Sequence, residues 1–392
     1  FIGGEPAQIA GSADRVDFSV VDMPAAPAEE KLNAMAQAID QEVRRPFNLS
    51  KDLMLRATVF RVSKNEQVLV LTMHHIASDG WSIGVLVHEL SEAYLAFTTG
   101  AVPKLPDLPI QYADFARWQR QFLQGPALET ALSFWKQQLA GLPEFNELIP
   151  LNHPRPPQQT FGGAVVKMIL PESFVSAMAE LGQMRRATVF MVMLAAFQAL
   201  LQRYSGKDDV SVGVPVANRT RPEFANLIGC FINMVVVRGD VSGNPTFLEF
   251  LGRVREASLA AFFHPELPFS ELVRHLRPKR STSHTPLFQV QLVFQNYPMP
   301  AIQWPGLTIT RFETETATSK FDLSVFIEQK EQKEGLEIAF EYNTALFEPS
   351  AMQRMLDEYR LLLEGVVKNP EARLRDIPIH APVSQEGCQS SF

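Results

Sequence analysis

The apolar positions in the N-terminal part of the chain follow two different periods. Alternating apolar and polar residues predict a strand over residues 15–21, and apolar residues at helical spacing predict a helix over 29–43. Residues 67–73 are almost entirely apolar and contain β-branched side chains, which predicts a central strand buried on both faces. Helical spacing resumes after this run and predicts an amphipathic helix that ends near residue 97.

Strands and helices stay mixed along the rest of the chain, and several strands are adjacent in sequence. This order predicts an α+β fold of sandwich type rather than a doubly wound sheet. A proline-rich stretch over 142–161 resists both helix and sheet, so we place the boundary there and predict two domains, 1–157 and 158–392. The further predicted strands are 55–62, 164–169, 209–214, 234–237, 288–294, 307–312, 321–327 and 336–342, and the further helices include 188–204, 247–263 and 350–367.

Candidate chemistry lies where the apolar run 67–73 meets the following helix. His74 and His75 end the predicted strand, and Asp79 and Gly80 stand just before the helix. Histidine titrates near neutral pH, and a helix N-terminus offers N–H groups to a developing negative charge. Gly80 also permits a backbone angle that other residues resist. A base and oxyanion donors therefore meet in this loop, whereas a metal is not expected because adjacent strand residues point to opposite faces.

The motif His-His-x-x-x-Asp-Gly followed by Trp81 and Ser82 resembles the signature of condensation domains of nonribosomal peptide synthetases, in the chloramphenicol acetyltransferase-like superfamily. Later segments resemble the family in the same order, although Pro265 and Glu266 depart from its usual residues. These segments are Tyr-Ala-Asp-Phe-Ala-Arg-Trp at 112–118, Gly-Cys-Phe-Ile-Asn at 229–233, His-Pro-Glu-Leu-Pro-Phe at 264–269, Arg-Ser-Thr-Ser-His-Thr-Pro-Leu at 280–287 and Phe-Asp-Leu at 321–323.

The resemblance implies a fold, a reaction and partners. The fold would be two chloramphenicol acetyltransferase-like α/β sandwich lobes that form a V with a central tunnel. The reaction would join a donor acyl or peptidyl thioester to the amine of an acceptor aminoacyl thioester. Both substrates would ride on phosphopantetheine arms of donor and acceptor peptidyl carrier domains, beside an adenylation domain, and the chain itself would bind no cofactor. We lean towards a donor of L configuration.

The same resemblance assigns roles to individual residues. His75 is the catalytic base or positioning group, and His74 packs behind it. Asp79 is either a second base or a carboxylate that holds the loop, and we favour the second because buried carboxylates are normally paired. Trp81 and Asn233 support the tunnel, although Asn233 is equally consistent with a bond to nearby backbone.

Two motifs of the family that lie upstream are absent from this sequence. One carries an arginine that is thought to support the motif aspartate, so that support for Asp79 cannot be assigned. We therefore expect the chain to be truncated at its N-terminus. The aromatic residues Tyr112, Phe115 and Trp118 recur at helical spacing and are expected to pack into a core.

Composition narrows the class of protein further. Of 392 residues, 46% are hydrophobic and 20% charged, and the net charge of −7 without a basic run argues against a nucleic-acid partner. No apolar run is long enough to cross a membrane. Cys230 and Cys388 fit no zinc or disulfide pattern, which favours a reducing, cytoplasmic location.

Two other functions stay open on sequence grounds. One is an acyltransferase of the same superfamily that uses acyl-coenzyme A. The other is a non-catalytic module that only docks carrier domains. The intact residues His75, Asp79 and Gly80 argue against the second alternative.

Overall fold

The computed structural model describes residues 7–9, 11, 16–24, 27–143, 145–279, 281–297, 302, 304–312, 317–330 and 334–380. Its contacts divide the chain into two units, which are described separately. The first unit consists of Phe1–Pro109, Asn226–Phe231 and Met299–Thr316. The second unit consists of Ile110–Ala225, Ile232–Pro298 and Ala317–Phe392. Arg15 in the first predicted strand, Arg280 and Cys388 lie outside the described residues.

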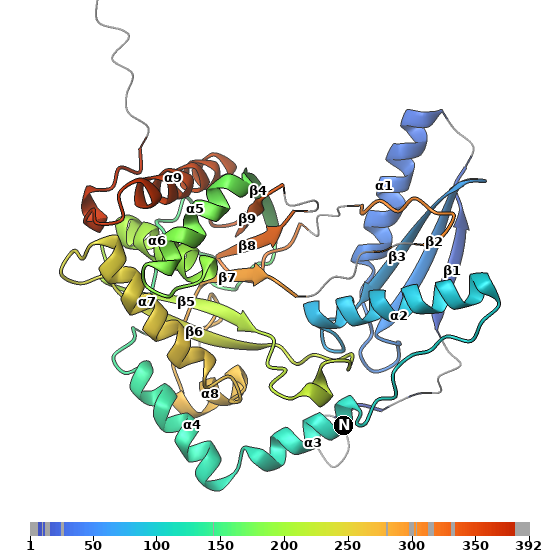
Figure 1. The fold of residues 1–392 in the computed structure, drawn as a ribbon, viewed down its shortest axis with the longest axis horizontal. Coiled ribbons are helices and arrows are strands. Elements are labelled where there is room, and N and C mark those ends of the chain that lie inside the picture. The colour runs from blue at the N-terminus through green and yellow to red at the C-terminus, as the bar shows by residue number, and fades with distance from the viewer. Residues whose placement is uncertain are drawn as a thin grey trace, which may run out of the picture. The chain divides into compact units, whose positions relative to one another are not determined.

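The first unit is built on a three-stranded sheet of order β1-β2-β3, with β1 parallel and β3 antiparallel to the central strand. Helix α1 lies against this sheet, because Met35 and Ile39 of the helix pack on Phe60 and Val62 of β2. Figure 1 shows these strands beside α1 and α2. The bounds are β1 Asp17–Asp22, α1 Ala28–Arg44, β2 Leu55–Ser63, β3 Glu66–Met73 and α2 Gly80–Thr99.

Strand β3 is at the expected place in the chain but not in the expected environment. It pairs with β2 on one side only and forms an edge of the described sheet. Leu69 and Leu71 are 42% and 36% exposed. The prediction of a central strand buried on both faces is therefore wrong, because an apolar run does not reveal whether neighbouring elements cover both sides.

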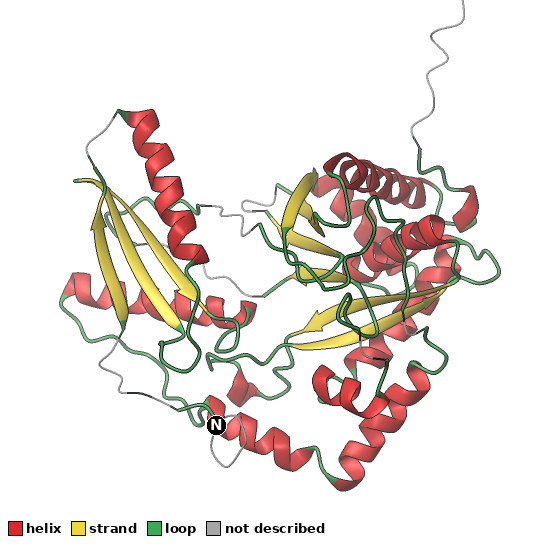
Figure 2. Ribbon diagram, turned by 180° about the vertical axis from the view of Figure 1, so that it is seen from behind, coloured by secondary structure: helices red, strands yellow, loops and turns green. Residues whose placement is uncertain are grey.

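The second unit is built on a six-stranded mixed sheet of order β4-β9-β8-β7-β5-β6. Helices α6, α7 and α9 pack on this sheet, and α5 packs on α6 and α9; Figure 2 draws the helices of this unit in red beside the yellow strands. The strands are β4 Gly163–Leu170, β5 Asp209–Val216, β6 Asn233–Asp240, β7 Val290–Gln295, β8 Leu323–Gln329 and β9 Leu336–Asn343. The helices are α3 Tyr112–Phe122, α4 Gly125–Gln138, α5 Glu172–Gln183, α6 Val189–Ser205, α7 Phe247–Phe262, α8 Phe269–Leu276 and α9 Pro349–Lys368.

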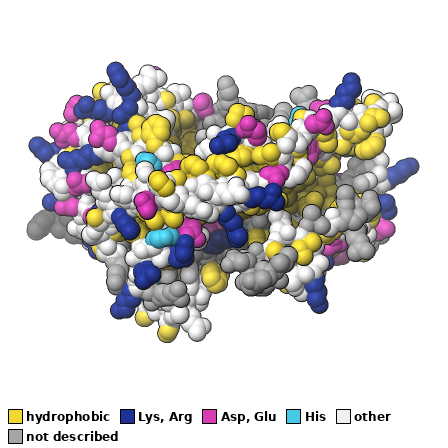
Figure 3. Space-filling view, turned by 90° about the horizontal axis from the view of Figure 1, so that it is seen from below, with side chains coloured by type: hydrophobic (Ala, Val, Ile, Leu, Met, Phe, Trp, Pro, Cys, Tyr) yellow, Lys and Arg dark blue, Asp and Glu magenta, His cyan; other side chains and the backbone are white. Residues whose placement is uncertain are grey.

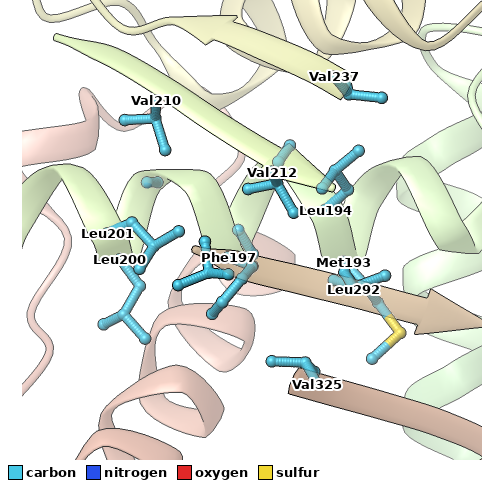
Figure 4. Close-up of a cluster of buried hydrophobic side chains, with 14 of the residues drawn as sticks. Met193, Leu194, Phe197, Leu200, Leu201, Val210, Val212, Val237, Leu292 and Val325 are labelled. Atoms are coloured by element: carbon cyan, nitrogen blue, oxygen red, sulfur yellow. The ribbon is translucent and has the colours of Figure 1, made fainter. Parts of the chain in front are cut away.

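Helix α6 is the centre of the second core. Residues 191–202 of this helix are all buried, so it carries apolar side chains on every face. In Figure 4 Met193, Leu194 and Phe197 lie among valines and a leucine of four strands. Those strand residues are Val210, Val212, Val237, Leu292 and Val325. The predicted mixed α+β architecture with two sheets is confirmed.

Helices α3 and α4 group with the second unit, whereas the sequence-based division at residue 157 placed them in the first lobe. Their contacts give the reason. The Phe115 ring meets the Phe224 ring edge-on, with centroids 5.0 Å apart, and the Trp135 indole N–H donates to the carbonyl of His264 at 3.3 Å. The expected packing of Phe115 into a core is confirmed, since this side chain is buried.

One predicted strand is wrong. Residues 307–312 form no strand, and the segment that contains them is fixed instead by Trp304. The indole of Trp304 stacks on Tyr94 of α2 at 4.6 Å and donates its N–H to Ser91 Oγ at 3.0 Å. The side chains of Leu307, Ile309 and Phe312 are 52%, 40% and 46% exposed, so the apolar residues of this segment are not buried in a sheet core.

The surface charges, the helices and the possible metal ligands add three observations. On the face drawn in Figure 3, Lys and Arg side chains are interspersed with Asp and Glu rather than gathered in one patch. In the described part of the chain, every helix falls short of the length and hydrophobicity that a membrane span requires. Within the same part, His, Cys, Asp and Glu form no group of three or more that could hold a metal ion.

Candidate functional site

The candidate site begins where β3 ends. The N–H of His74 still donates to the carbonyl of Met54, which closes the pairing with the chain before β2. The chain then turns, because the N–H of Ala77 donates back to the carbonyl of His74 at 3.0 Å. Asp79 is the N-cap residue of α2, so the whole motif occupies one tight connection between a strand and a helix.

His74 is held from two sides within this turn. Its Nδ1 accepts a hydrogen bond from the N–H of Ile76 at 3.0 Å, which leaves the ring proton of the neutral imidazole on Nε2. The ring meets Phe47 edge-on, with centroids 5.7 Å apart, and the side chain is half-buried. These contacts fit the structural role expected of His74.

His75 differs from its neighbour because its side chain is exposed. Its Nδ1 lies 3.9 Å from the Sγ of Cys230, a residue 155 positions further along the chain. Nothing in the sequence argument had paired these two residues. The contact exists because residues 226–231 belong to the first unit although they lie far along the sequence from its sheet.

The carboxylate of Asp79 is buried and bonded to backbone. It is 4% exposed, and its Oδ1 accepts from the N–H of Ser82 at 2.8 Å as an N-cap. Its Oδ2 accepts from the N–H of Phe231 at 3.0 Å. The positive end of the α2 dipole also stabilises this charge. Asp79 therefore joins two segments of chain, which is the loop-holding role favoured from the sequence.

Ser82 makes a second connection at the same place. Its hydroxyl is fully buried and lies 2.8 Å from Asp79 Oδ1 and 2.9 Å from the carbonyl of Gly229. The same Oγ accepts from the N–H of Gly229 at 3.1 Å. Sequence reasoning quoted Ser82 and Cys230 as parts of motifs but gave neither a role, because the pairing of the two motifs appears only in the tertiary structure.

Gly80 and Trp81 are the first two residues of α2, and both are partly exposed. Gly80 is not among the described glycines with a positive φ, so the first residue of α2 does not use the backbone freedom that glycine permits. The backbone N–H of Gly80 belongs to the positive end of the helix, where an anion is favoured.

Asn233 belongs to the second unit, so its position is described there alone. Its amide nitrogen donates to the carbonyls of Pro265 and Leu267 at 2.9 and 2.7 Å. Its Oδ1 accepts from the N–H of Phe269 at 2.9 Å. The side chain therefore fixes the loop before α8, as expected if Asn233 bonds to nearby backbone.

This arrangement joins an exposed imidazole to a rigid frame. His75 can accept or orient a proton, while Asp79 and Ser82 keep the turn and the start of α2 in place. Amides at the start of the helix can face a developing negative charge. These are the groups that acyl transfer to an amine requires.

Comparisons with known proteins identify the family that the whole chain resembles. The family model described as "Condensation domain" matches residues 2–387. One of the proteins that form the linear gramicidin synthase of Brevibacillus parabrevis is 40% identical over 393 residues, which cover 100% of this chain and 5% of that protein. The chain therefore spans only a small part of the synthase protein that it resembles.

Solved structures share the fold of this chain. The X-domain from teicoplanin biosynthesis superimposes with a TM-score of 0.85 at 26% identity and covers 95% of this chain and 83% of that one. The structure described as a complex of the X-domain and OxyB has a TM-score of 0.79 at 27% identity, and the match covers 94% of this chain and 80% of that one.

Proposed function

Because the chain belongs to the condensation-domain family, we propose that it forms the amide bond between two carrier-bound thioesters. The observation that carries this proposal is the motif itself: His75 is exposed in a turn that Asp79 and Ser82 hold rigidly at the start of α2. The donor would be an acyl or peptidyl thioester, and the acceptor an aminoacyl thioester.

The chemistry makes modest demands on these residues. The acceptor amine attacks the thioester carbonyl carbon, a C–N bond forms, and the C–S bond breaks to release a thiol. An α-amine titrates at about 8 and a thiol at about 8.5, so neither a strong base nor a strong acid is needed. His75 orients the amine and takes its proton, which passes on to the leaving thiolate.

Two further residues complete the proposed site. In the proposed mechanism the N–H of Gly80, at the positive end of α2, stabilises the oxyanion of the tetrahedral intermediate. Asp79 takes no proton in this scheme, because its oxygens already accept bonds from the N–H groups of Ser82 and Phe231. Trp81 and Asn233 act as supports, and neither touches the reacting atoms.

The proposed partners are donor and acceptor peptidyl carrier domains with phosphopantetheine arms, next to an adenylation domain. Support comes from the likeness to part of a peptide synthase. A cytoplasmic location is proposed with them, because the chain carries only two cysteines and such partners work in a reducing compartment.

A second candidate function is a docking module without catalysis. The observation that favours it is the likeness to the X-domain, which has been solved in complex with OxyB. In that case the exposed His75 would contribute nothing to turnover. Acyl transfer from coenzyme A is the third possibility and is separated by the same experiment.

The test is single-turnover condensation. Donor and acceptor carriers are loaded with aminoacyl phosphopantetheine, the purified chain is added, and dipeptidyl carrier is followed by intact mass. We expect dipeptide from the wild type and none from a folded His75→Ala variant. His74→Ala is the matched control, and it should lose stability but keep turnover per folded molecule, because His74 packs on Phe47 and bonds within the turn.

Each alternative has its own outcome in this assay. Full turnover by His75→Ala would remove His75 from the mechanism. Acyl transfer to an amine from acyl-coenzyme A, but not from a loaded carrier, would favour the coenzyme A-dependent acyltransferase. Carrier binding without any product, from wild type and variant alike, would favour the docking module.

A further inference from the structure

The backbone on both sides of Cys230 is anchored to the catalytic loop. Before it, Gly229 is bonded through its carbonyl and its N–H to the Ser82 hydroxyl, at 2.9 and 3.1 Å. After it, the N–H of Phe231 donates to the buried carboxylate of Asp79. A residue fixed at both neighbours has little freedom to move its Cα, so the fold sets the direction of its Cα–Cβ bond and leaves only the staggered χ1 rotamers for the sulfur.

That side chain is directed at the candidate catalytic imidazole. The Sγ of Cys230 lies 3.9 Å from Nδ1 of His75, within the range of a sulfur–nitrogen hydrogen bond. Cys230 is half-buried while His75 is exposed. The half-buried thiol is therefore a fixed partner for an imidazole that otherwise projects into solvent.

We propose that Cys230 is a positioning residue for His75, and that its sulfur holds Nδ1 so that Nε2 is the nitrogen offered to the acceptor amine. This inference rests on the proposed condensation function, since it names the residue that prepares the base. It assigns Cys230 no contact with the substrate.

The chemistry of the ring explains why this matters. A neutral imidazole has one N–H and one lone pair, and only the nitrogen with the lone pair can take a proton. If Nδ1–H faces the sulfur, the lone pair is on Nε2, which is the form that a base needs. A thiol sulfur is a weak acceptor, so it orients the ring without the strong rise in basicity that a carboxylate partner would cause.

The proposal makes a specific kinetic prediction. Without Sγ the ring samples other rotamers and the other tautomer, so a smaller fraction of molecules is ready to react. We expect Cys230→Ala to lower the single-turnover rate by roughly 10- to 100-fold, the scale for losing a partner that orients a functional histidine, with half-saturating carrier concentration unchanged. Cys230→Ser keeps a polar atom there and should recover part of the rate, whereas Cys230→Val fills the space but should not.

The variants are made in a Cys388→Ser background, which leaves Cys230 as the single thiol of the chain. Cys388→Ser alone is the control and should match the wild type. Before substrate is added, iodoacetamide treatment should inactivate the Cys388→Ser control, which retains Cys230. The same treatment should leave the activity of the variant that also carries Cys230→Ser unchanged. Melting temperatures close to that of the control show that the rate changes are not losses of folded protein.

A second measurement does not depend on activity. Nitrogen-15 NMR of the histidine rings, with His75→Gln to assign the signal, reports which ring nitrogen carries the proton. We expect protonated Nδ1 in the control chain and a shift towards the mixed tautomers of free imidazole in Cys230→Ala and Cys230→Val. Because this needs no substrate, it separates a failure of this inference from a failure of the proposed condensation.

Three results would overturn the inference. The first is an unchanged His75 tautomer in both apolar variants. The second is an unchanged single-turnover rate in Cys230→Ala when the control chain is active. The third is an acyl adduct on Cys230 in the intact mass, since that would make the thiol a nucleophile rather than a positioning group.

Discussion

Asp79 and Phe231 are 152 positions apart in the chain, and the backbone N–H of Phe231 donates to the Asp79 carboxylate at 3.0 Å. This single bond joins the start of α2 to a segment that enters the first unit from the middle of the sequence. The carboxylate of the motif aspartate thus holds two segments of the chain together.

The first prediction concerns the charge and acceptors of Asp79. Asp79→Asn replaces one acceptor oxygen by an NH₂ group, which then faces either the N–H of Ser82 or that of Phe231. One buried bond is lost and two donors oppose each other, so we expect a loss of about 1–3 kcal/mol in the free energy of unfolding. Activity should fall in proportion to the folded fraction, measured by urea unfolding and single turnover on the same samples.

A matched variant isolates the effect of burial. Asp114 accepts from the N–H of Gln111 in an exposed capping box at the start of α3. Asp114→Asn should cost only about a few tenths of a kcal/mol, because the remaining amide oxygen can still accept this bond and water solvates the exposed NH₂ group. An Asp79→Asn protein with wild-type melting and no turnover would mean that Asp79 acts in the chemistry itself.

The second prediction compares two fully buried serines. Ser82→Ala leaves the N–H and carbonyl of Gly229 without their hydroxyl partner, and we expect a loss of about 2 kcal/mol. The hydroxyl of Ser258 in α7 is buried with no hydrogen-bond partner among the described residues. Ser258→Ala should therefore be neutral or stabilising by about 0.5 kcal/mol, since alanine also favours the helix. Equal effects of the two substitutions in urea unfolding would contradict this assignment.

The third prediction concerns Asn233. Asn233→Ala removes a side chain that bonds to the backbone of Pro265, Leu267 and Phe269, so we expect a loss of about 2–3 kcal/mol. Asn233→Asp keeps the acceptor but sets a buried carboxylate oxygen against the carbonyls of Pro265 and Leu267, so near neutral pH it should be at least as destabilising as Asn233→Ala. Hydrogen exchange should rise locally at the N-terminal end of α8, and protection unchanged there would argue that the side chain does not hold the loop.

The fourth prediction is a pH dependence of stability. Desolvation raises the pKa of Glu341 in β9 to about 7, although Lys320 and a hydrogen bond from Ser324 oppose the shift. The unfolded chain releases this proton at lower pH, so between about 4.5 and 7 the folded state binds more protons and stability falls as pH rises. Glu341→Gln removes this cost.

The corresponding measurement is urea unfolding at two pH values. After allowance for the part of the side chain that solvent screens, Glu341→Gln should be about 1 kcal/mol more stable than wild type at pH 8 and close to it at pH 4.5. Glu180→Gln, on an exposed position of α5, is the matched control and should change little at either pH. A variant that gains nothing at pH 8 would show that Glu341 ionises in the fold without penalty.

Local pattern determined the elements and the family of this protein. Helical spacing predicted the bounds of α1, α6 and α9 to within a few residues, because the spacing of apolar residues along a helix depends only on the local sequence. The motif around His75 and Asp79 pointed to acyl transfer for a similar reason. It places a base, a capping carboxylate and a helix start within seven residues of sequence, from residue 74 to residue 80.

Tertiary structure alone decided what lies next to these residues. That β3 is an edge of the described sheet, that Trp304 packs along α2, and that Cys230 meets His75 are all contacts between distant segments. Each of these contacts joins segments that are far apart in the sequence, whereas hydrophobic periodicity reports only on residues within one helix or strand. The sequence therefore specified which side chains could act at the site, and the fold specified which of them touch.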